Sequence, residues 1–313
     1  VLFIFLDGIG LGENNPETNP LARAKMPNLN ALLDGRSLLK ESAPFDGEHA
    51  SLLALDAGVG VDGLPQSATG QAMLLTGKNI SAELGYHYGP KPNPEVAAYL
   101  KGETIFSKCV AAGKRAALLN AYPPRYFQGI DSGKRLYSSI PLGVTNAGLE
   151  LFKYEDLVAG RALSADFTGE GWRTMLGFPE SPVMEPREAG RKLISLAMEY
   201  DFSFFEYWAS DYAGHKQQME TAVGLMEAFD GVLGGIVESG KWKVEDERGK
   251  RKDELLVLVT SDHGNMEDLS TRKHTDADVP LIVIGSKSAR EESTRGMTDL
   301  THVAPAIWRM VGV

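Results

Sequence analysis

The chain has 313 residues, of which 43% are hydrophobic, and a formal charge of −10. This composition is that of a globular protein with one large core, or a core domain that carries a second, smaller one. The acidic charge argues against binding to nucleic acid or anionic membranes, which need a positive surface, and no apolar run approaches the ~20 residues that span a bilayer.

Short apolar runs alternate with helical segments along the chain. Pro186 opens one predicted helix, and another is predicted at Gln217–Glu238, where apolar residues recur every three or four positions. The runs end at Asp, Gly, Ser or Pro, as strands buried on both faces do; they lie at residues 1–6, 115–120, 202–208, 255–260 and 279–284. The pattern predicts an α/β fold, a doubly wound, mostly parallel sheet sandwiched by helices. The mixed-charge run at 241–254 is predicted to be a solvent-exposed loop.

Acidic residues follow three of the apolar runs. Asp7 follows the first, Asp211 lies just past the third, and Asp262 comes after the fourth. Because ligands of open α/β sheets bind beyond the carboxyl ends of the strands, we expect these three carboxylates to meet at one edge. Taken singly, each aspartate could instead cap a helix or a turn.

Three histidines accompany these aspartates. His215 stands four residues after Asp211, His263 is adjacent to Asp262, and His274 precedes the last apolar run. Three carboxylates and three imidazoles suit two divalent metal ions, with manganese or zinc expected first and magnesium or iron also compatible. Spacing alone does not divide the ligands between the ions.

Two hydroxyl residues, Ser67 and Thr69, lie in a loop that leads into an apolar, helix-like segment at 71–75. A helix N-terminus favours an anion such as phosphate, although Ser and Thr are also ordinary helix caps. Beside two cations, a serine can lose its proton, attack phosphorus and form a covalent intermediate.

Cysteine content bears on the compartment. Cys109 is the single cysteine, which excludes an internal disulfide and a cysteine-based zinc cluster. The expected location is therefore cytoplasmic. Because the chain opens at Val1 and not at Met, removal of a leader, and with it export, stays open.

Six strings resemble one metalloenzyme family: LDGIGLG, QSATGQ, SDYAGH, SDHGNMED, KHTDADVPLIVIG and DLTHVAPAIWRMVG. They are similar to the alkaline phosphatase superfamily, and closest to the core of cofactor-independent phosphoglycerate mutase and its phosphopentomutase relatives. The resemblance implies a metal-binding catalytic core at residues 1–78 and 187–313. It also implies an inserted smaller cap or substrate domain at residues 79–186.

The resemblance further implies roles for the site residues. Ser67 corresponds to the nucleophile that forms a phosphoserine, with Thr69 as the fallback. The six ligands divide into two sets: Asp7, Asp262 and His263 for one ion, and Asp211, His215 and His274 for the other.

Two departures concern the substrate. Gln71 stands where the nucleophile motif usually has His, and the long phosphoglycerate-binding domain of the mutase has no match. We therefore expect a small phosphorylated metabolite of unspecified identity. Arg125, Lys134 and Arg135 are candidate contacts for its second anionic group, or else solvated surface charges.

Charge favours phosphoryl transfer at this site. Three aspartates and two divalent ions leave one net positive charge, which attracts a phosphate dianion, and paired cations stabilise entering and leaving groups. The predicted function is metal-dependent phosphoryl transfer on a phosphate monoester through a phosphoserine. If water then attacks the phosphoserine, the protein is a phosphatase. If the retained alcohol presents another hydroxyl to it, the protein is a phosphomutase. A phosphoglycerate-mutase-like isomerase and a non-catalytic metal- or phosphate-binding protein are the alternatives, and the oligomeric state stays unknown.

Overall fold

The fold is known from a computed structural model that describes residues 1–240 and 255–313. The loop predicted at 241–254 lies outside the described residues. Within the described ranges, none of the helices combines the length and the apolar composition that a membrane crossing requires.

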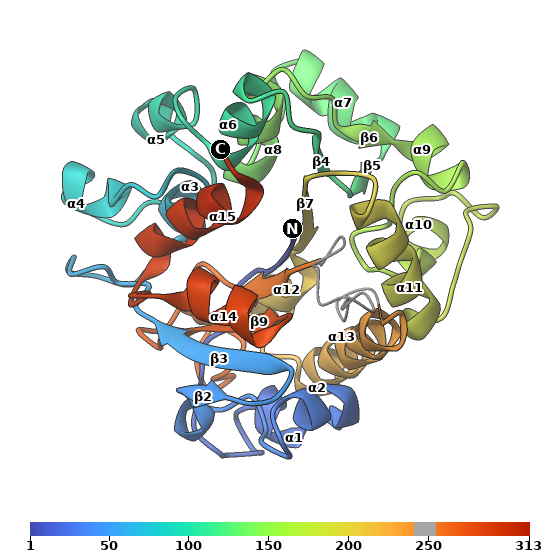
Figure 1. The fold of residues 1–313 in the computed structure, drawn as a ribbon. Coiled ribbons are helices and arrows are strands. Elements are labelled where there is room, and N and C mark those ends of the chain that lie inside the picture. The colour runs from blue at the N-terminus through green and yellow to red at the C-terminus, as the bar shows by residue number, and fades with distance from the viewer. Residues whose placement is uncertain (241–254) are drawn as a thin grey trace, which may run out of the picture.

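A seven-stranded sheet forms the centre of the molecule, in the order β2-β3-β9-β8-β1-β7-β4 (Figure 1). Four adjacent strands are parallel: β8 (Val257–Thr260), β1 (Leu2–Leu6), β7 (Phe202–Tyr207) and β4 (Ala116–Leu118). The other three continue the sheet in antiparallel fashion: β9 (Val279–Ile284), β3 (Ala50–Leu55) and β2 (Phe45–Asp46). The predicted α/β fold class is confirmed.

Helices cover both faces because the residues of the central strands alternate between them. On β7, Phe205 and Tyr207 face one apolar cluster, whereas Phe202 and Phe204 face the other. The first face is covered by α11 (Pro186–Ala197) and α13 (Met219–Glu238), which pack side by side, with α1 (Pro20–Arg23) and α2 (Pro27–Leu32) against α13.

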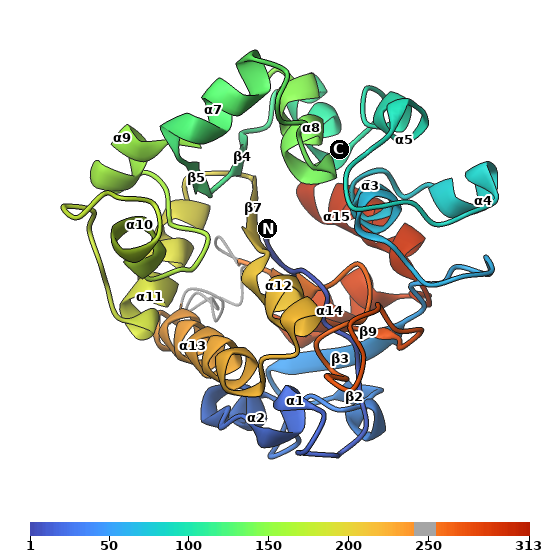
Figure 2. The ribbon, with the colours of Figure 1, turned by 180° about the vertical axis from the view of Figure 1, so that it is seen from behind.

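The second face carries α3 (Ser67–Thr76), α6 (Ile105–Ala111), α8 (Ser139–Asn146) and α15 (Val303–Val311). Figure 2 shows α3, α8 and α15 together on that side. Further elements pack beside them: α4 (Ile80–Leu84), α5 (Pro94–Tyr99), α14 (Lys287–Thr294) and a 3₁₀ turn at Leu300–His302. Another 3₁₀ turn, at Lys40–Ser42, follows Leu38 and Leu39 of the first apolar cluster. Both predicted helices, at Pro186 and at 217–238, are present.

Part of the segment predicted as an inserted domain, residues 79–186, belongs to the core. Its strand β4 pairs in parallel with β7 of the main sheet, and α6 and α8 pack against α3. Residues 79–118 therefore pack with the sheet and the helices of the core, whereas the division of the chain into a catalytic core and a cap or substrate domain stays a prediction. A short strand such as β4 joins the sheet through pairing that its own sequence does not specify.

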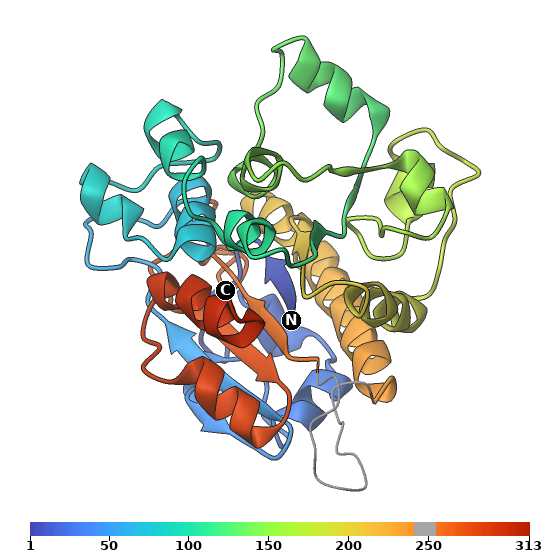
Figure 3. The same cartoon turned by 45° about the horizontal axis from the view of Figure 1, so that its top comes forward.

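The remainder of that segment packs partly on its own. It comprises α7 (Pro124–Asp131), α9 (Tyr154–Val158), α10 (Glu170–Thr174) and a two-stranded sheet of β5 (Ala121–Tyr122) and β6 (Phe152–Lys153). These residues, green to yellow-green in Figure 3, lie toward the top of the view. A small apolar cluster of Ala121, Leu157, Ala162 and Trp172 holds them together.

A side chain continues the sheet where β4 ends. Asn120 Nδ2 donates to the carbonyl of Glu206, and Asn120 Oδ1 accepts from the N–H of Glu206, both at 2.8 Å. The amide thus replaces the strand pairing that the predicted run at 115–120 would have made through its backbone. It also satisfies two buried backbone groups at the end of β7.

We expect Asn120→Ala to lower the free energy of unfolding by about 1–3 kcal/mol, because both backbone groups of Glu206 would lose their partners in a buried place. Urea denaturation would measure the change. Gln128→Ala, on the exposed side of α7, is the control and should be nearly neutral. Equal denaturation midpoints for Asn120→Ala and the wild type would contradict this account.

Candidate metal centre

Four segments of the chain meet at the carboxyl edge of the parallel strands. Asp7 directly follows β1, Asp262 and His263 follow β8, and Asp211 lies in the helix after β7. His274 precedes β9, and the antiparallel direction of this strand brings its start to the same edge. The directions of the strands thus bring these ligands, which are distant in sequence, to one edge of the sheet, as expected.

One cluster consists of Asp7, Asp262 and His263. His263 Nε2 lies 3.4 Å from Asp7 Oδ1 and 3.6 Å from Asp262 Oδ1, and the three side chains could hold one metal ion. Asp7 Oδ1 and both carboxylate oxygens of Asp262 are buried without a hydrogen-bond partner. Because such atoms are costly to bury unpaired, they fit a bound cation.

A second cluster joins α12 (Ala209–Lys216) to the loop before β9. His215 Nε2 lies 3.4 Å from Asp211 Oδ2, and His274 Nε2 lies 3.2 Å from His215 Nε2 and 3.7 Å from Asp211 Oδ1. The two clusters adjoin: the rings of His263 and His274 stack at 3.7 Å, and Asp211 with these two histidines forms another possible ligand set. The division of the six ligands between two ions therefore stays a prediction.

A backbone carbonyl orients each imidazole. Because a carbonyl can only accept, Nδ1 must carry the proton in all three rings, which leaves the Nε2 lone pair available for a metal. The bonds run from His263 to Gly264 at 3.3 Å, from His274 to Pro65 at 2.8 Å and from His215 to Arg272 at 2.7 Å.

Burial sets the protonation of the site. Desolvation, with a contribution from the Asp211 carboxylate, raises the pKa of Asp7 well above its ordinary value and that of Asp262 to about 7. Desolvation lowers the pKa of His263 to about 4 and also lowers that of His274. The imidazoles of His263 and His274 are thus neutral, as ligands must be, whereas the carboxylates of Asp7 and Asp262 need a positive partner to stay charged.

Ser67 is the first residue of α3 and faces the first cluster. Its Oγ lies 3.0 Å from His263 Nε2. The helix approaches closely because residue 70 is glycine: a Cβ there would lie 2.8 Å from the Cβ of Asp262. The helix that carries the predicted nucleophile is therefore pressed against a predicted ligand.

Thr69, the fallback nucleophile, is engaged elsewhere. Its hydroxyl lies 3.2 Å from the carbonyl of Gln66 and 3.4 Å from that of Tyr88, and it accepts from the N–H of Tyr88. The geometry favours Ser67 over Thr69 as the candidate nucleophile.

The three predicted substrate contacts lie in and after α7. Arg125, Lys134 and Arg135 are exposed, and the guanidinium of Arg135 lies over the ring of Tyr126, 4.7 Å from its centroid. In the described chain no hydrogen bond or ion pair joins them to the six candidate ligands. Their role in substrate binding stays a prediction.

A buried carboxyl group beside the centre escaped the sequence analysis. Glu206 on β7 is 8% exposed and accepts a hydrogen bond from the hydroxyl of Tyr122. Burial raises the pKa of Glu206 to about 7, and its charge contributes to the raised pKa of Asp7. A single acidic residue inside the aromatic strand FSFFEY gives no pattern that would distinguish it.

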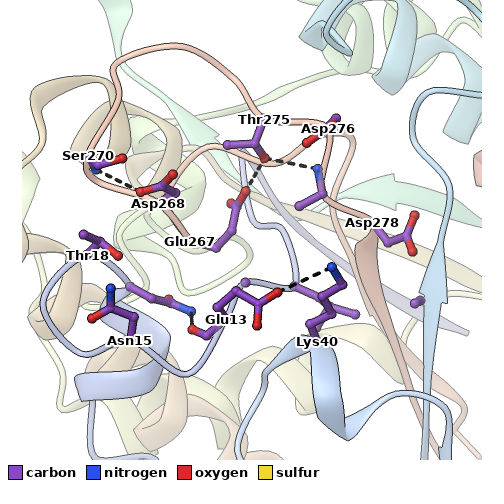
Figure 4. Close-up of a pocket in the computed structure, with 15 residues that line it drawn as sticks. Glu13, Asn15, Thr18, Lys40, Glu267, Asp268, Ser270, Thr275, Asp276 and Asp278 are labelled. Carbon is purple, nitrogen blue, oxygen red and sulfur yellow. Dashed lines mark hydrogen bonds and ion pairs between the residues drawn. The ribbon is translucent and has the colours of Figure 1, made fainter.

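A pocket of about 590 Å³ lies against the loop that joins β8 to β9, and none of the six candidate ligands lines it (Figure 4). Its charged lining comprises one basic and five acidic residues: Lys40, Glu13, Glu267, Asp268, Asp276 and Asp278. This acidic lining disfavours a phosphate ester, so the carboxyl edge and not this pocket is the candidate phosphate site.

Comparisons with known proteins bear on the family and the fold. Residues 174–313 match the model of the Metalloenzyme superfamily. The 2,3-bisphosphoglycerate-independent phosphoglycerate mutase of Thiobacillus denitrificans is 32% identical over 141 residues, which are 42% of this chain and 25% of that protein. The chain thus matches only a quarter of the length of this curated relative.

Two solved structures share the fold across almost the whole chain. The alkaline phosphatase of the Antarctic bacterium TAB5 has a TM-score of 0.56 at 12% identity and covers 100% of this chain and 98% of its own. The PH0037 protein of Pyrococcus horikoshii has a TM-score of 0.53 at 14% identity, with 99% and 96% covered.

We expect Glu206→Gln to change how stability depends on pH in metal-free protein. The folded state keeps a proton on Glu206 up to about pH 7, whereas the unfolded state releases it near 4.5. Protonation of Glu206 therefore contributes fully to the free energy of unfolding below pH 4.5. This contribution, roughly 3 kcal/mol, is lost as the pH rises to about 7.

Urea denaturation across this pH range would test it. The stability of the wild type relative to Glu206→Gln should fall with rising pH. The exposed Glu188→Gln should track the wild type. A constant difference between wild type and Glu206→Gln would show that Glu206 is ionised throughout.

Proposed function

We propose that this chain belongs to the alkaline phosphatase superfamily and that it transfers phosphoryl groups from phosphate monoesters. The match to the Metalloenzyme superfamily and the likeness to a 2,3-bisphosphoglycerate-independent phosphoglycerate mutase support this proposal. The observation that carries the proposal is the contact of Ser67 with the first ligand cluster. A hydroxyl 3.0 Å from His263 Nε2 lies beside carboxylate oxygens that have no other partner.

The six candidate ligands would hold two divalent ions, manganese or zinc in the first place, which supply positive charge for the phosphate and for the transition state. The donor set suits them: it comprises three carboxylates and three imidazoles. At least four of these side chains are largely buried, and some of their carboxylate oxygens have no hydrogen-bond partner. The Nε2 atoms of the three histidines already face the ligand clusters, so the rings would not have to turn to bind an ion.

The chain's own residues then perform the chemistry. Ser67 loses its hydroxyl proton and its Oγ forms a bond to phosphorus as the bond from phosphorus to the alcohol oxygen breaks; the alcohol oxygen takes up a proton. The position of Ser67 at the start of α3 places the developing negative charge at the positive end of that helix. The product of this half-reaction is a phosphoserine and a free alcohol.

The second half-reaction defines the enzyme as a phosphatase or as a phosphomutase. If water attacks the phosphorus of the phosphoserine, inorganic phosphate is released. If a second hydroxyl of the retained alcohol attacks instead, the product is an isomer of the substrate with the phosphate on that hydroxyl. The segment that would hold the alcohol is the part of the chain beyond β4, which contributes Tyr122 beside Glu206. The substrate we propose is a small phosphorylated metabolite.

We expect Ser67→Ala to reduce metal-dependent hydrolysis of a chromogenic phosphate ester by about 10³-fold or more. Among the described residues, no other side-chain hydroxyl is hydrogen-bonded to the side chain of a candidate ligand. Mass spectrometry of the wild type should show a phosphoserine at residue 67 that the variant lacks. Ser132→Ala, at an exposed serine after α7, is the matched control.

Phosphorus NMR with candidate phosphorylated metabolites would separate the two outcomes, since a phosphatase gives inorganic phosphate and a mutase a moved ester. Full activity of Ser67→Ala would show that a residue other than Ser67 is the nucleophile. Metal binding without turnover or phosphoserine would leave a non-catalytic binding protein.

Metal content provides a second measurement. We expect the wild type, stripped with a chelator and reloaded with manganese or zinc, to retain two ions per chain by elemental analysis. Asp262→Asn and Asp211→Asn should each retain about one, since each removes a carboxylate from a different cluster. A wild type that retains no divalent ion would contradict the proposed metal centre.

A further inference from the structure

We propose that Glu267 is a positioning residue, a single buried carboxylate that fixes the metal-ligand loops relative to one another. The inference rests on the proposed function only in taking the six ligands as a metal centre. Glu267 itself belongs to neither ligand cluster.

The carboxylate of Glu267 accepts three hydrogen bonds. Oε2 accepts from the N–H of Gly10 at 2.9 Å and from the N–H of Asn265 at 2.8 Å. Oε1 accepts from the hydroxyl of Thr275, a contact drawn in Figure 4. Glu267 is 3% exposed, so these bonds replace water as the partners of its charge.

Each of the three donors stands close to a candidate ligand in the sequence, and the donors belong to three different places in the chain. The pairs are Gly10 after Asp7, Asn265 after His263, and Thr275 after His274. Glu267 itself lies on the loop between β8 and β9, and its side chain therefore connects the loop after β1 with the beginning and the end of that β8–β9 loop.

Two glycines leave room for this carboxylate. A Cβ on Gly10 would lie 2.5 Å from Glu267 Cδ, and a Cβ on Gly264 would lie 2.4 Å from Glu267 Oε1. Both distances are shorter than real contacts, so any side chain at either position would displace the carboxylate. The local sequences LDGIG and DHGN are thus matched to a glutamate at 267.

Asn265 extends the connection to the fourth ligand-bearing segment. Its backbone N–H is bound by Glu267, and its side-chain Nδ2 donates to Asp211 Oδ1 at 2.6 Å and to the Asp211 carbonyl at 3.3 Å. Glu267 and Asn265 together therefore join all four segments that carry the six ligands. Partners of this kind tune metal affinity without touching the metal.

Glutamine is a weaker substitute for this glutamate. Its volume is the same, but it is neutral and has one acceptor oxygen, so the charge that strengthens all three hydrogen bonds is lost. Its amide nitrogen would face either the two backbone N–H donors, which repel it, or the Thr275 hydroxyl, which would have to change from donor to acceptor. The attachment of the loops would weaken while the packing stays filled. The Glu267→Gln variant thus separates hydrogen bonding from volume.

The test measures binding of Mn²⁺ to chelator-stripped protein by calorimetry. We expect Glu267→Gln to weaken binding by about 10- to 100-fold, the usual effect of losing such a partner. Asp268→Asn makes the same charge change one residue away, where the side chain accepts only from the N–H of Ser270, and should bind within about twofold of the wild type. The visible spectrum of the Co²⁺ form should change in Glu267→Gln alone, because the coordination geometry changes.

A threonine pair covers the case in which Glu267→Gln does not fold. Thr275→Val removes the hydroxyl and should weaken Mn²⁺ binding, whereas Thr275→Ser keeps it and should restore binding.

Three results would overturn the inference: unchanged affinity in Glu267→Gln, equal weakening in Glu267→Gln and Asp268→Asn, or a wild type that binds no Mn²⁺. Normal metal binding without phosphoryl transfer would remove the proposed function and leave the positioning role in place.

Discussion

Mutual repulsion among buried carboxylates is the constraint around which the rest of this molecule is arranged. Asp7, Asp211 and Asp262 converge from three strand ends, and burial penalises each further charge brought to the same place. Only a rigid frame keeps such groups together. The parallel strands β8, β1 and β7 supply it, because their backbone pairing fixes the strand ends within one edge of the sheet.

The frame is reinforced by contacts that neutralise little charge but restrict movement. Carbonyl groups fix the rings of the three histidines, Asn120 closes the end of β7 with its side chain, and Glu267 joins the loop after β1 to both ends of the β8–β9 loop. Because of these contacts, the conformational entropy of the site is lost when the chain folds and not when a metal binds. A metal or a substrate then meets ligands that are already in position.

The sequence predicted the features that local pattern determines. The run at 279–284 coincides with β9, and the residues just past β1, β7 and β8 do gather, because strand direction converts sequence position into spatial position. The hairpin of β2 and β3 was missed, since ASLLAL at 50–55 suits a helix as well as a strand. Nothing in the sequence indicated that β4, inside the segment predicted as a cap, would pair with β7 of the main sheet.

Residues defined by long-range contacts gave no sequence signal. Glu206 meets Tyr122 across 84 positions, and Glu267 meets Gly10 across 257. Neither glutamate has a neighbour in the sequence that indicates its partner. The ligands were recognisable by type and place, whereas the residues that hold them in place became visible only in three dimensions.

The order of the ligands along the chain has a consequence for biogenesis. Asp7 and its two partners in the first cluster are separated by residues 8–261, and β1 lies between β7 and β8, both made far later. On the ribosome, this inner strand of the sheet is therefore made long before either of its neighbours. Until they emerge, β1 is an unpaired apolar segment of the kind that is prone to aggregate, and the first cluster cannot be complete until residue 263 has been added.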